Sequence, residues 1–333
     1  MVAQLWPLHS SVKDRLHKEY VDFYNKYLIN NPRVHQLSLS AARSGGVVCY
    51  SKPLPVGKTQ EFTIRRRQTF GPDIRIRTFT PPGTPPRPGG WPLVVYHHGG
   101  GWVCGDITSE NTICTNMCIR ANAVVMTTDY RLAPEHAWPA AIHDSWESFL
   151  WATSDGAEIL NLDLDRIAFS GASAGSNIAA VIAQKVVLNP QPGVTIRSQV
   201  LAVPITDNTA TPTTNPTWKD LEFTAGLPSR KMLWYRDHYL PDKVDCSHRE
   251  ASPLLASDEL FASLPPAVII VAELDVLRSD GENYVRKLRD NGVEADLHVI
   301  QGVPHPFIGM DGVLEAGRRG ITIMCDSLVK AFA

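Results

Sequence analysis

The chain has 333 residues, of which 32 are basic, 34 are acidic and 44% are hydrophobic, so its formal net charge is −2. Because the charges are balanced and intermixed, the composition argues against binding to nucleic acid or to an anionic membrane. The length and apolar content suffice for one large α/β domain with a smaller added part.

Apolar runs, cysteines and histidines bear on the compartment and on cofactors. The longest apolar runs are shorter than the ~18–20 residues of a transmembrane helix, and the first seven residues lack the basic and apolar regions of a secretory signal. The six cysteines are scattered without a C-x-x-C pair, so we expect free thiols and a cytoplasmic location. The eleven histidines are dispersed and no H-E-x-x-H motif occurs, so we expect no metal and no other cofactor. Whether the protein forms a homodimer is not decided by the sequence.

The first ninety residues predict a helical segment followed by a hairpin. Aromatic and leucine residues within 1–60 recur at helical spacing, which predicts one or two helices there. Residues 62–70 and 73–79 are typical of two strands, and Gly71-Pro72 between them is a turn signal, so an antiparallel hairpin is expected. Residues 81–90 contain five prolines and predict a surface loop.

From residue 93 onward, strand and helix patterns alternate. Strands are predicted at 93–97, 122–128, 166–170, 197–203, 266–272 and 295–301. Helices are predicted at about 108–121, 138–153, 175–188, 279–292 and 313–331. This alternation predicts a mostly parallel sheet with right-handed crossovers. Some fifty residues after the strand at 197–203 break the rhythm, and their aromatic and leucine content favours helices over a structureless loop.

Residues 171–175 read GASAG, in a context typical of a catalytic serine. The residues before this pentapeptide resemble a short strand, and those after it carry alanine and apolar residues at helical spacing. A serine between a strand and a helix, flanked by glycines, is typical of a nucleophile elbow, a turn too tight for larger side chains. Ser173 is the predicted nucleophile.

A second motif, His98-Gly99-Gly100-Gly101-Trp102, directly follows the apolar run at 92–97. Consecutive glycines bury no side chain and cost backbone entropy, so core packing does not explain them. One interpretation is a flexible loop. The other is a loop whose backbone amides approach a substrate oxygen closely, as in the HGGG loop of lipases and esterases.

Together with residues 129–136 (DYRLAPEH) and 138–144 (WPAAIHD), these motifs make the chain similar to the hormone-sensitive-lipase-like branch of the α/β-hydrolase fold. The resemblance covers roughly residues 92–307. It implies fold class α/β, a mostly parallel central sheet flanked by helices, with a helical cap. It also implies a serine carboxylesterase that cleaves an ester substrate through a Ser-His-Asp triad and an acyl-enzyme.

The acid of such a triad follows the serine in the chain. Asp275 comes just after the strand predicted at 266–272, where the active-site loops of open α/β sheets gather. Glu273 and Asp280 compete with it, but Asp280 is expected to cap the helix beginning near residue 281. The family's D-x-L pattern also selects Asp275.

The base comes last in the chain, and His305 follows the last predicted strand. The family has H-G-F at this place, whereas this chain has His305-Pro306-Phe307, and proline removes one amide donor from the loop. His98 is expected to brace the glycine loop rather than act as the base. The resemblance further implies that the amides of Gly99, Gly100 and Ala174 receive the oxyanion.

The family places a cap in two positions, which here correspond to residues 1–60 and 205–250, around a core of residues 61–204 and 251–333. A cap with many aromatics narrows the pocket, so we expect short to medium acyl esters as substrates. Trp102, Trp218 and Trp234 are expected to line this pocket, with the equal alternative that these rings only hold the cap on the core.

Two other functions stay open. An acyltransferase, or a product-releasing or lactone-forming enzyme of a biosynthetic pathway, would keep the same triad. A non-catalytic receptor with the same fold would lack the triad histidine, so the presence of Ser173, Asp275 and His305 together disfavours it.

Overall fold

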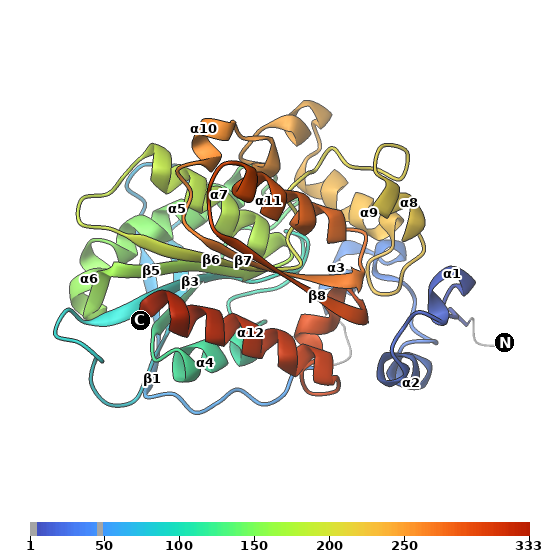
Figure 1. The fold of residues 1–333 in the computed structure, drawn as a ribbon, viewed down its shortest axis with the longest axis horizontal. Helices are drawn as coiled ribbons and strands as arrows, with labels where there is room; N and C mark the ends of the chain where they lie inside the picture. Colours follow the sequence, from blue (N-terminus) through green and yellow to red (C-terminus); the bar gives the residue numbers. More distant parts are fainter. Residues whose placement is uncertain (1–4, 45–48) are drawn as a thin grey trace.

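The computed structural model describes residues 5–44 and 49–333 and is built around one eight-stranded sheet in the order β1-β2-β4-β3-β5-β6-β7-β8 (Figure 1). The strands are β1 (Lys58–Ile64), β2 (Ile74–Thr80), β3 (Trp91–His97), β4 (Val124–Thr128), β5 (Leu162–Ala172), β6 (Ile196–Ala202), β7 (Ala267–Leu274) and β8 (Ala295–Pro304). β2 is antiparallel to both β1 and β4, and every other pair is parallel. The predicted α/β class is confirmed.

Helices cover both faces of this sheet. Helices α4 (Asn111–Arg120) and α12 (Glu315–Phe332) pack against each other on one face, and α5 (Ala140–Ala152), α7 (Ala174–Leu188) and α11 (Arg278–Asp290) lie on the other (Figure 1). All residues of β3 and β4 are buried, because helices cover both faces of the sheet, and most of these residues are apolar. The short α6 (Asp155–Leu160), η3 (Pro253–Leu255) and α10 (Asp258–Phe261) complete this part.

The predicted hairpin forms, but its first strand lies earlier than expected, at 58–64 instead of 62–70. The residues that follow leave the sheet because side chains of α5 hold them. The carboxylate of Glu147 accepts the backbone N–H groups of Arg67, Gln68 and Thr69, and Arg66 forms a buried ion pair with Asp144. These tertiary contacts outweigh the local strand pattern.

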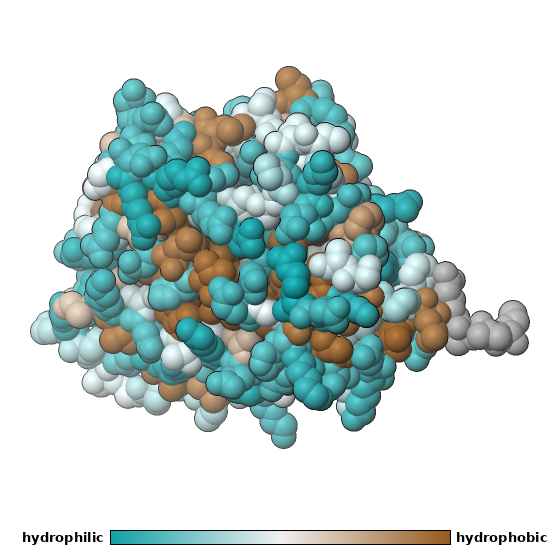
Figure 2. Space-filling view, turned by 45° about the vertical axis from the view of Figure 1, so that its right-hand side comes forward, coloured by the Kyte–Doolittle hydropathy of each residue, from teal (hydrophilic) through white to brown (hydrophobic). Residues whose placement is uncertain are grey.

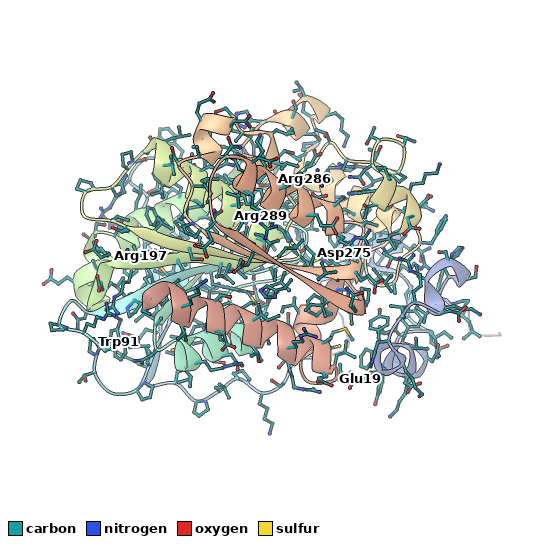
Figure 3. All side chains as sticks on the ribbon, viewed as in Figure 1. Glu19, Trp91, Arg197, Asp275, Arg286 and Arg289 are labelled. Atoms are coloured by element: carbon teal, nitrogen blue, oxygen red, sulfur yellow. The ribbon has the colours of Figure 1, made fainter. Side chains whose placement is uncertain are left out.

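Two segments distant in sequence meet at the carboxyl ends of the parallel strands. The first contains α1 (Ser10–Lys13), α2 (Lys18–Tyr27), η1 (Val34–Gln36) and α3 (Leu39–Ser44); the second contains α8 (Pro216–Asp220), α9 (Ser229–Tyr239) and η2 (Lys243–Ser247). Helix α9 packs against η1, and both segments lie on the right in Figure 1. Figure 3 shows Asp275 at this end of the sheet, whereas Trp91 and Arg197, near strand starts, lie at the opposite end.

The surface in Figure 2 is mostly hydrophilic, with apolar residues scattered in small groups. Within the described part of the chain, each helix is too short or too polar to cross a bilayer.

Candidate active site

Ser173 occupies a strained turn between β5 and α7. Its backbone has φ +55° and ψ −118°, a conformation that side-chain-bearing residues rarely adopt. The flanking glycines are required by space, because a Cβ on Gly175 would lie 1.9 Å from the carbonyl oxygen of His97 and one on Gly171 would lie 2.4 Å from the Gly175 carbonyl carbon. The structure therefore contains the tight turn between a strand and a helix that the sequence predicts at residues 171–175.

The structure brings Ser173, His305 and Asp275 into one hydrogen-bonded chain. The distance from Ser173 Oγ to His305 Nε2 is 2.8 Å, and that from His305 Nδ1 to Asp275 Oδ2 is 2.6 Å. Since a carboxylate only accepts, Nδ1 carries the proton and Nε2 presents its lone pair to the serine hydroxyl. Asp275 is fully buried, and its other oxygen accepts the backbone N–H of Leu277.

The two competing acids lie elsewhere. Glu273 accepts the backbone N–H of Gly302 at 2.8 Å and so ties β7 to β8. Asp280 is not an N-cap as expected; it lies inside the first turn of α11, and its carboxyl accepts the amides of Thr206 and Asp207. The reason is that α11 begins earlier, at Arg278, and burial of Asp280 raises its pKa to about 8.

Pro306 fits the loop after β8 because that loop is a 3-10 helix, η4 (His305–Met310). Pro306 is its second residue, where the missing N–H has no intrahelical acceptor in any case. The departure from the family's H-G-F therefore leaves His305 in place.

The glycine loop lies directly against Ser173. A Cβ on Gly99 would be 3.6 Å from that of Ser173, while Gly100 and Gly101 have φ values of +113° and +62° that favour glycine. Gly99, Gly100 and Gly101 all line the same cavity as Ser173. Ala174 is the first residue of α7, so its N–H has no acceptor within the helix.

Of the three amides predicted for the oxyanion, that of Gly99 interacts with the carboxyl of Glu110, and this interaction acts to lower the pKa of Glu110. The same carboxyl accepts hydrogen bonds from the hydroxyls of Tyr96 at 2.6 Å and Tyr50 at 3.4 Å. Glu110 is buried, and burial raises its pKa to about 7 although these donors act in the opposite direction. No motif in the sequence points to Glu110, which is a single acidic residue before α4.

His98 braces the loop, as expected. Its ring stacks on Tyr130 with centroids 4.2 Å apart, and its Nδ1 lies 2.7 Å from the carbonyl oxygen of Gly99. The Tyr130 hydroxyl donates to the His98 carbonyl at 2.7 Å. Burial lowers the pKa of His98 to about 4, so the ring is neutral and hydrogen-bonded rather than a base facing the cavity.

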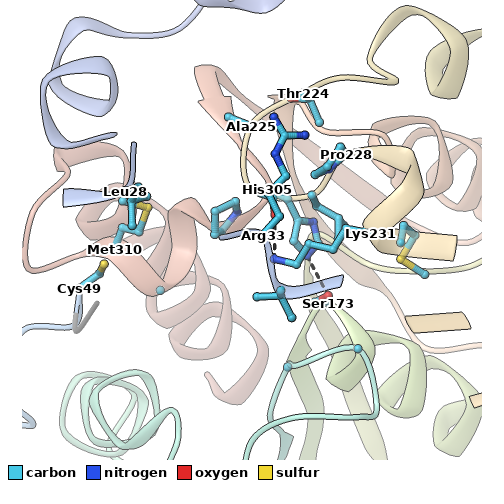
Figure 4. A pocket seen from close by; sticks show the side chains of 18 of the residues that line it. Leu28, Arg33, Cys49, Ser173, Thr224, Ala225, Pro228, Lys231, His305 and Met310 are labelled. Carbon is cyan, nitrogen blue, oxygen red and sulfur yellow. Dashed lines mark hydrogen bonds between the residues drawn. The ribbon is translucent and has the colours of Figure 1, made fainter. Parts of the chain in front are cut away.

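A cavity of about 600 Å³ opens over Ser173 and His305 (Figure 4). Its walls come from the glycine loop, from the segment containing α2 and η1, and from residues 223–235. Apolar side chains such as Phe23, Leu28 and Met232 alternate there with the basic Arg33 and Lys231. Across the described residues, no three His, Cys, Asp or Glu side chains converge as a metal site, and the absence of a metal stays a prediction.

The three tryptophans predicted for the pocket are placed elsewhere. Trp102 is fully buried and stacks on Tyr239 with centroids 4.3 Å apart, and Trp218 is fully buried under the Arg236 guanidinium. Trp234 is half-buried on α9, with its ring 4.4 Å from that of His238. The Trp102 ring joins the glycine loop to α9, and the Trp218 ring joins α8 to α9, while the neighbouring Tyr235 lines the cavity.

Comparison with known proteins agrees with this geometry. A model described as the α/β hydrolase fold matches residues 94–309. An AB hydrolase superfamily protein of Schizosaccharomyces pombe is 44% identical over 98% of this chain and 97% of that protein. The ethyl acetate hydrolase of Pseudomonas putida is 31% identical over 78% of this chain and 79% of that enzyme.

A solved structure is similar over nearly the whole length. The crystal structure of a thermostable esterase from Pseudomonas putida matches with a TM-score of 0.86 and 28% identity, covering 96% of this chain and 98% of that one. Sequence, fold and relatives thus agree, and the chain belongs to the α/β hydrolase family, in its hormone-sensitive-lipase-like branch of carboxylic ester hydrolases.

Proposed function

We propose that this protein hydrolyses carboxylic esters of short to medium acyl chains, with Ser173 as nucleophile, His305 as base and Asp275 as the acid that orients it. The observation that carries the proposal is the pair of short contacts, 2.8 Å and 2.6 Å, that links the three side chains. A serine hydroxyl is a weak nucleophile unless a base lies within hydrogen-bond reach, and this arrangement supplies one.

The reaction follows from the direction of these hydrogen bonds. His305 Nε2 takes the hydroxyl proton while Ser173 Oγ bonds to the ester carbonyl carbon. The resulting imidazolium is stabilised by Asp275 and returns its proton to the leaving alcohol as the ester C–O bond breaks. Water then repeats the sequence on the acyl-enzyme and releases the carboxylic acid.

The oxyanion would be received by backbone amides around the glycine loop. Gly100 and Ala174 keep the role that the family resemblance implies, and Gly101 offers the next amide along the cavity wall. The third predicted amide, that of Gly99, interacts with the Glu110 carboxyl, and this interaction would help to hold the loop in position. Losing one oxyanion donor typically costs ~10²–10³-fold in kcat, so the position of this loop matters as much as the triad.

Residues 1–60 and 205–250 are proposed to form the cap, around a core of residues 61–204 and 251–333. Support comes from the packing of α9 against η1 and from the contribution of both segments to the cavity wall. A cavity of about 600 Å³ is in the range of small-molecule pockets, which favours esters with about two to eight acyl carbons.

A cytoplasmic location is proposed from the thiols. Cys104, Cys114, Cys118, Cys246 and Cys325 form no disulfide, and four of these five side chains are buried. Unpaired buried thiols are typical of proteins from reducing compartments. Localisation of a fluorescent fusion tests this.

Hydrolysis of 4-nitrophenyl butyrate by the purified protein and by Ser173→Ala tests the function. We expect turnover by the wild type and a loss of at least ~10³-fold in the variant, with an unchanged circular dichroism spectrum. A serine-reactive phosphonate should label Ser173, which peptide mass spectrometry detects. Retained activity in the variant would refute the assignment of the nucleophile.

A further inference from the structure

The charged side chains along the cavity wall are mostly of one sign. Arg33 is the N-cap residue of η1, and Lys231 belongs to α9. Among the described lining residues, Glu110 is the only one with a carboxyl side chain, and the phenols of Tyr50 and Tyr96 already donate to it. The wall formed by η1 and α9 therefore presents basic groups without an acidic counterpart.

Lys231 lies between the loop that carries His305 and the glycine loop. Its Nζ donates to the carbonyl of Gly226 at 2.9 Å, and a Cβ on Gly226 would be 2.5 Å from Pro306, the residue after His305. On the other side, Nζ lies 5.8 Å from the centroid of the Tyr235 ring, which a Cβ on Gly101 would meet at 2.4 Å. Figure 4 shows Lys231 among the side chains that line the cavity together with His305 and Ser173.

This ammonium group is incompletely satisfied. It has three N–H donors, and the one acceptor that it contacts within the described residues is a neutral carbonyl. No ion pair joins Lys231 to a carboxylate in that part of the chain. Burial lowers its pKa to about 8, which leaves most of the side chain charged at neutral pH. Burying a cation without a counter-ion costs desolvation free energy, and an anion bound in the cavity would offset that cost.

The lowered pKa of His35 reflects burial and the positive charge of this wall, although the His35 ring is itself neutral at pH 7. Burial, followed by the charges of Arg230, Arg33 and Lys231, lowers the pKa of His35 to about 4. His35 Nδ1 is buried without a hydrogen-bond partner. Arg33 is half-buried, and its guanidinium lies 5.8 Å from the centroid of the Trp6 ring. Among residues 5–44 and 49–333, no carboxylate forms an ion pair with it.

We propose that Lys231, assisted by Arg33, binds a carboxylate carried by the substrate, so that the preferred substrates are esters with an acid group a few bonds from the ester carbonyl. This inference rests on the proposed ester hydrolysis. The carboxylate can belong to the acyl part, as in a half-ester of a dicarboxylic acid, or to the alcohol part, as in an acylated hydroxy acid. In both cases water adds, the ester C–O bond breaks, and one product keeps the recognised carboxylate while the other is the released acid or alcohol.

Two matched substrate pairs test this preference in a pH-stat. For the acyl side, monoethyl succinate is compared with ethyl pentanoate; for the alcohol side, 3-acetoxypropanoate is compared with butyl acetate. We expect the wild type to show a higher kcat/KM for the charged member of at least one pair. The pair that shows the effect identifies the side on which the carboxylate binds.

Substitution of Lys231 provides a second test of the same preference. Lys231→Met should lower the charged-to-neutral ratio of kcat/KM by about tenfold or more, mainly through KM, and Lys231→Arg should restore most of it. The matched control is Lys219→Met, which removes an exposed positive charge of α8 that does not line the cavity and should leave the ratio unchanged. A ratio that Lys231→Met does not change, or a wild type that prefers both neutral esters, would overturn the proposal.

A binding measurement separates this inference from the catalytic one. Succinate should bind Ser173→Ala protein in a calorimeter, neutral succinamide should bind less, and the Ser173→Ala, Lys231→Met double variant should lose the difference. Hydrolysis of neutral esters without any preference for charge would refute the carboxylate site alone. If none of the four esters is hydrolysed, the proposed function is refuted. Equal binding of succinate by both variants would refute the carboxylate site independently of catalysis.

Discussion

The hydroxyl of Tyr96 donates a 2.6 Å hydrogen bond to the carboxyl of Glu110, and both side chains are buried beside Gly99 of the glycine loop. Burial nevertheless raises the pKa of Glu110 from 4.5 to about 7. The folded protein thus binds this proton more tightly than the unfolded chain does between about pH 4.5 and pH 7. The contribution of Glu110 to the free energy of unfolding is therefore fully present below pH 4.5. It decreases as the pH rises and is lost once the pH has passed 7.

Glu110→Gln should remove this pH dependence. Between pH 4.5 and pH 8, we expect the free energy of unfolding of the wild type to fall by about 3 kcal/mol more than that of the variant. Urea unfolding at intervals of half a pH unit measures the difference. Asp280, whose pKa is also raised, remains in both proteins and cancels. Parallel curves would mean that Glu110 does not titrate in this range.

Asp275→Asn should lower kcat by about 10⁴-fold, because an amide cannot hold the His305 tautomer that presents a lone pair to Ser173. Steady-state kinetics on 4-nitrophenyl butyrate measures the loss. Glu273→Gln is the matched control: its carboxylate contacts Gly302 and not the triad, so we expect less than a tenfold change. A larger loss in the control than in Asp275→Asn would exchange the two assignments.

Gly101→Ala should lower kcat by about 10²-fold or more, because the new Cβ would meet the Tyr235 ring at 2.4 Å and displace the loop that receives the oxyanion. Gly83→Ala is the control. Gly83 also has a positive φ, +88°, but no atom lies within 4 Å of its added Cβ. It should cost about 1 kcal/mol of stability and leave kcat unchanged. Equal kinetic effects in both variants would indicate general strain instead of a displaced loop.

Activity should decline as the acyl chain lengthens beyond about eight carbons, because the cavity of about 600 Å³ is closed by α2, η1 and α9. The measurement is kcat/KM for 4-nitrophenyl esters from two to sixteen carbons. A steady rise to sixteen carbons, with activation at an oil–water interface, would instead identify a true lipase.

Sequence patterns, together with the family resemblance, were enough to predict the three side chains that the structure links by hydrogen bonds, Ser173, His305 and Asp275. Glycine is required at positions 171 and 175, because an added Cβ would lie only 2.4 and 1.9 Å from backbone atoms. The motif in the sequence therefore follows directly from the geometry of the turn. Asp275 and His305 each follow an apolar strand, and parallel strands bring their carboxyl ends to one edge of the sheet. Strand direction therefore explains why these three side chains, which are far apart in the sequence, lie together.

The lining of the pocket was decided only by tertiary structure. Arg33, Glu110 and Lys231 belong to segments without a distinctive motif, and they meet only where η1 and α9 pack over the glycine loop. Trp102 illustrates the converse, because its place beside the glycines predicted a pocket residue, yet its ring is buried against Tyr239. The direction of a side chain depends on which distant surface can bury it, and the residues nearby in sequence do not carry that information.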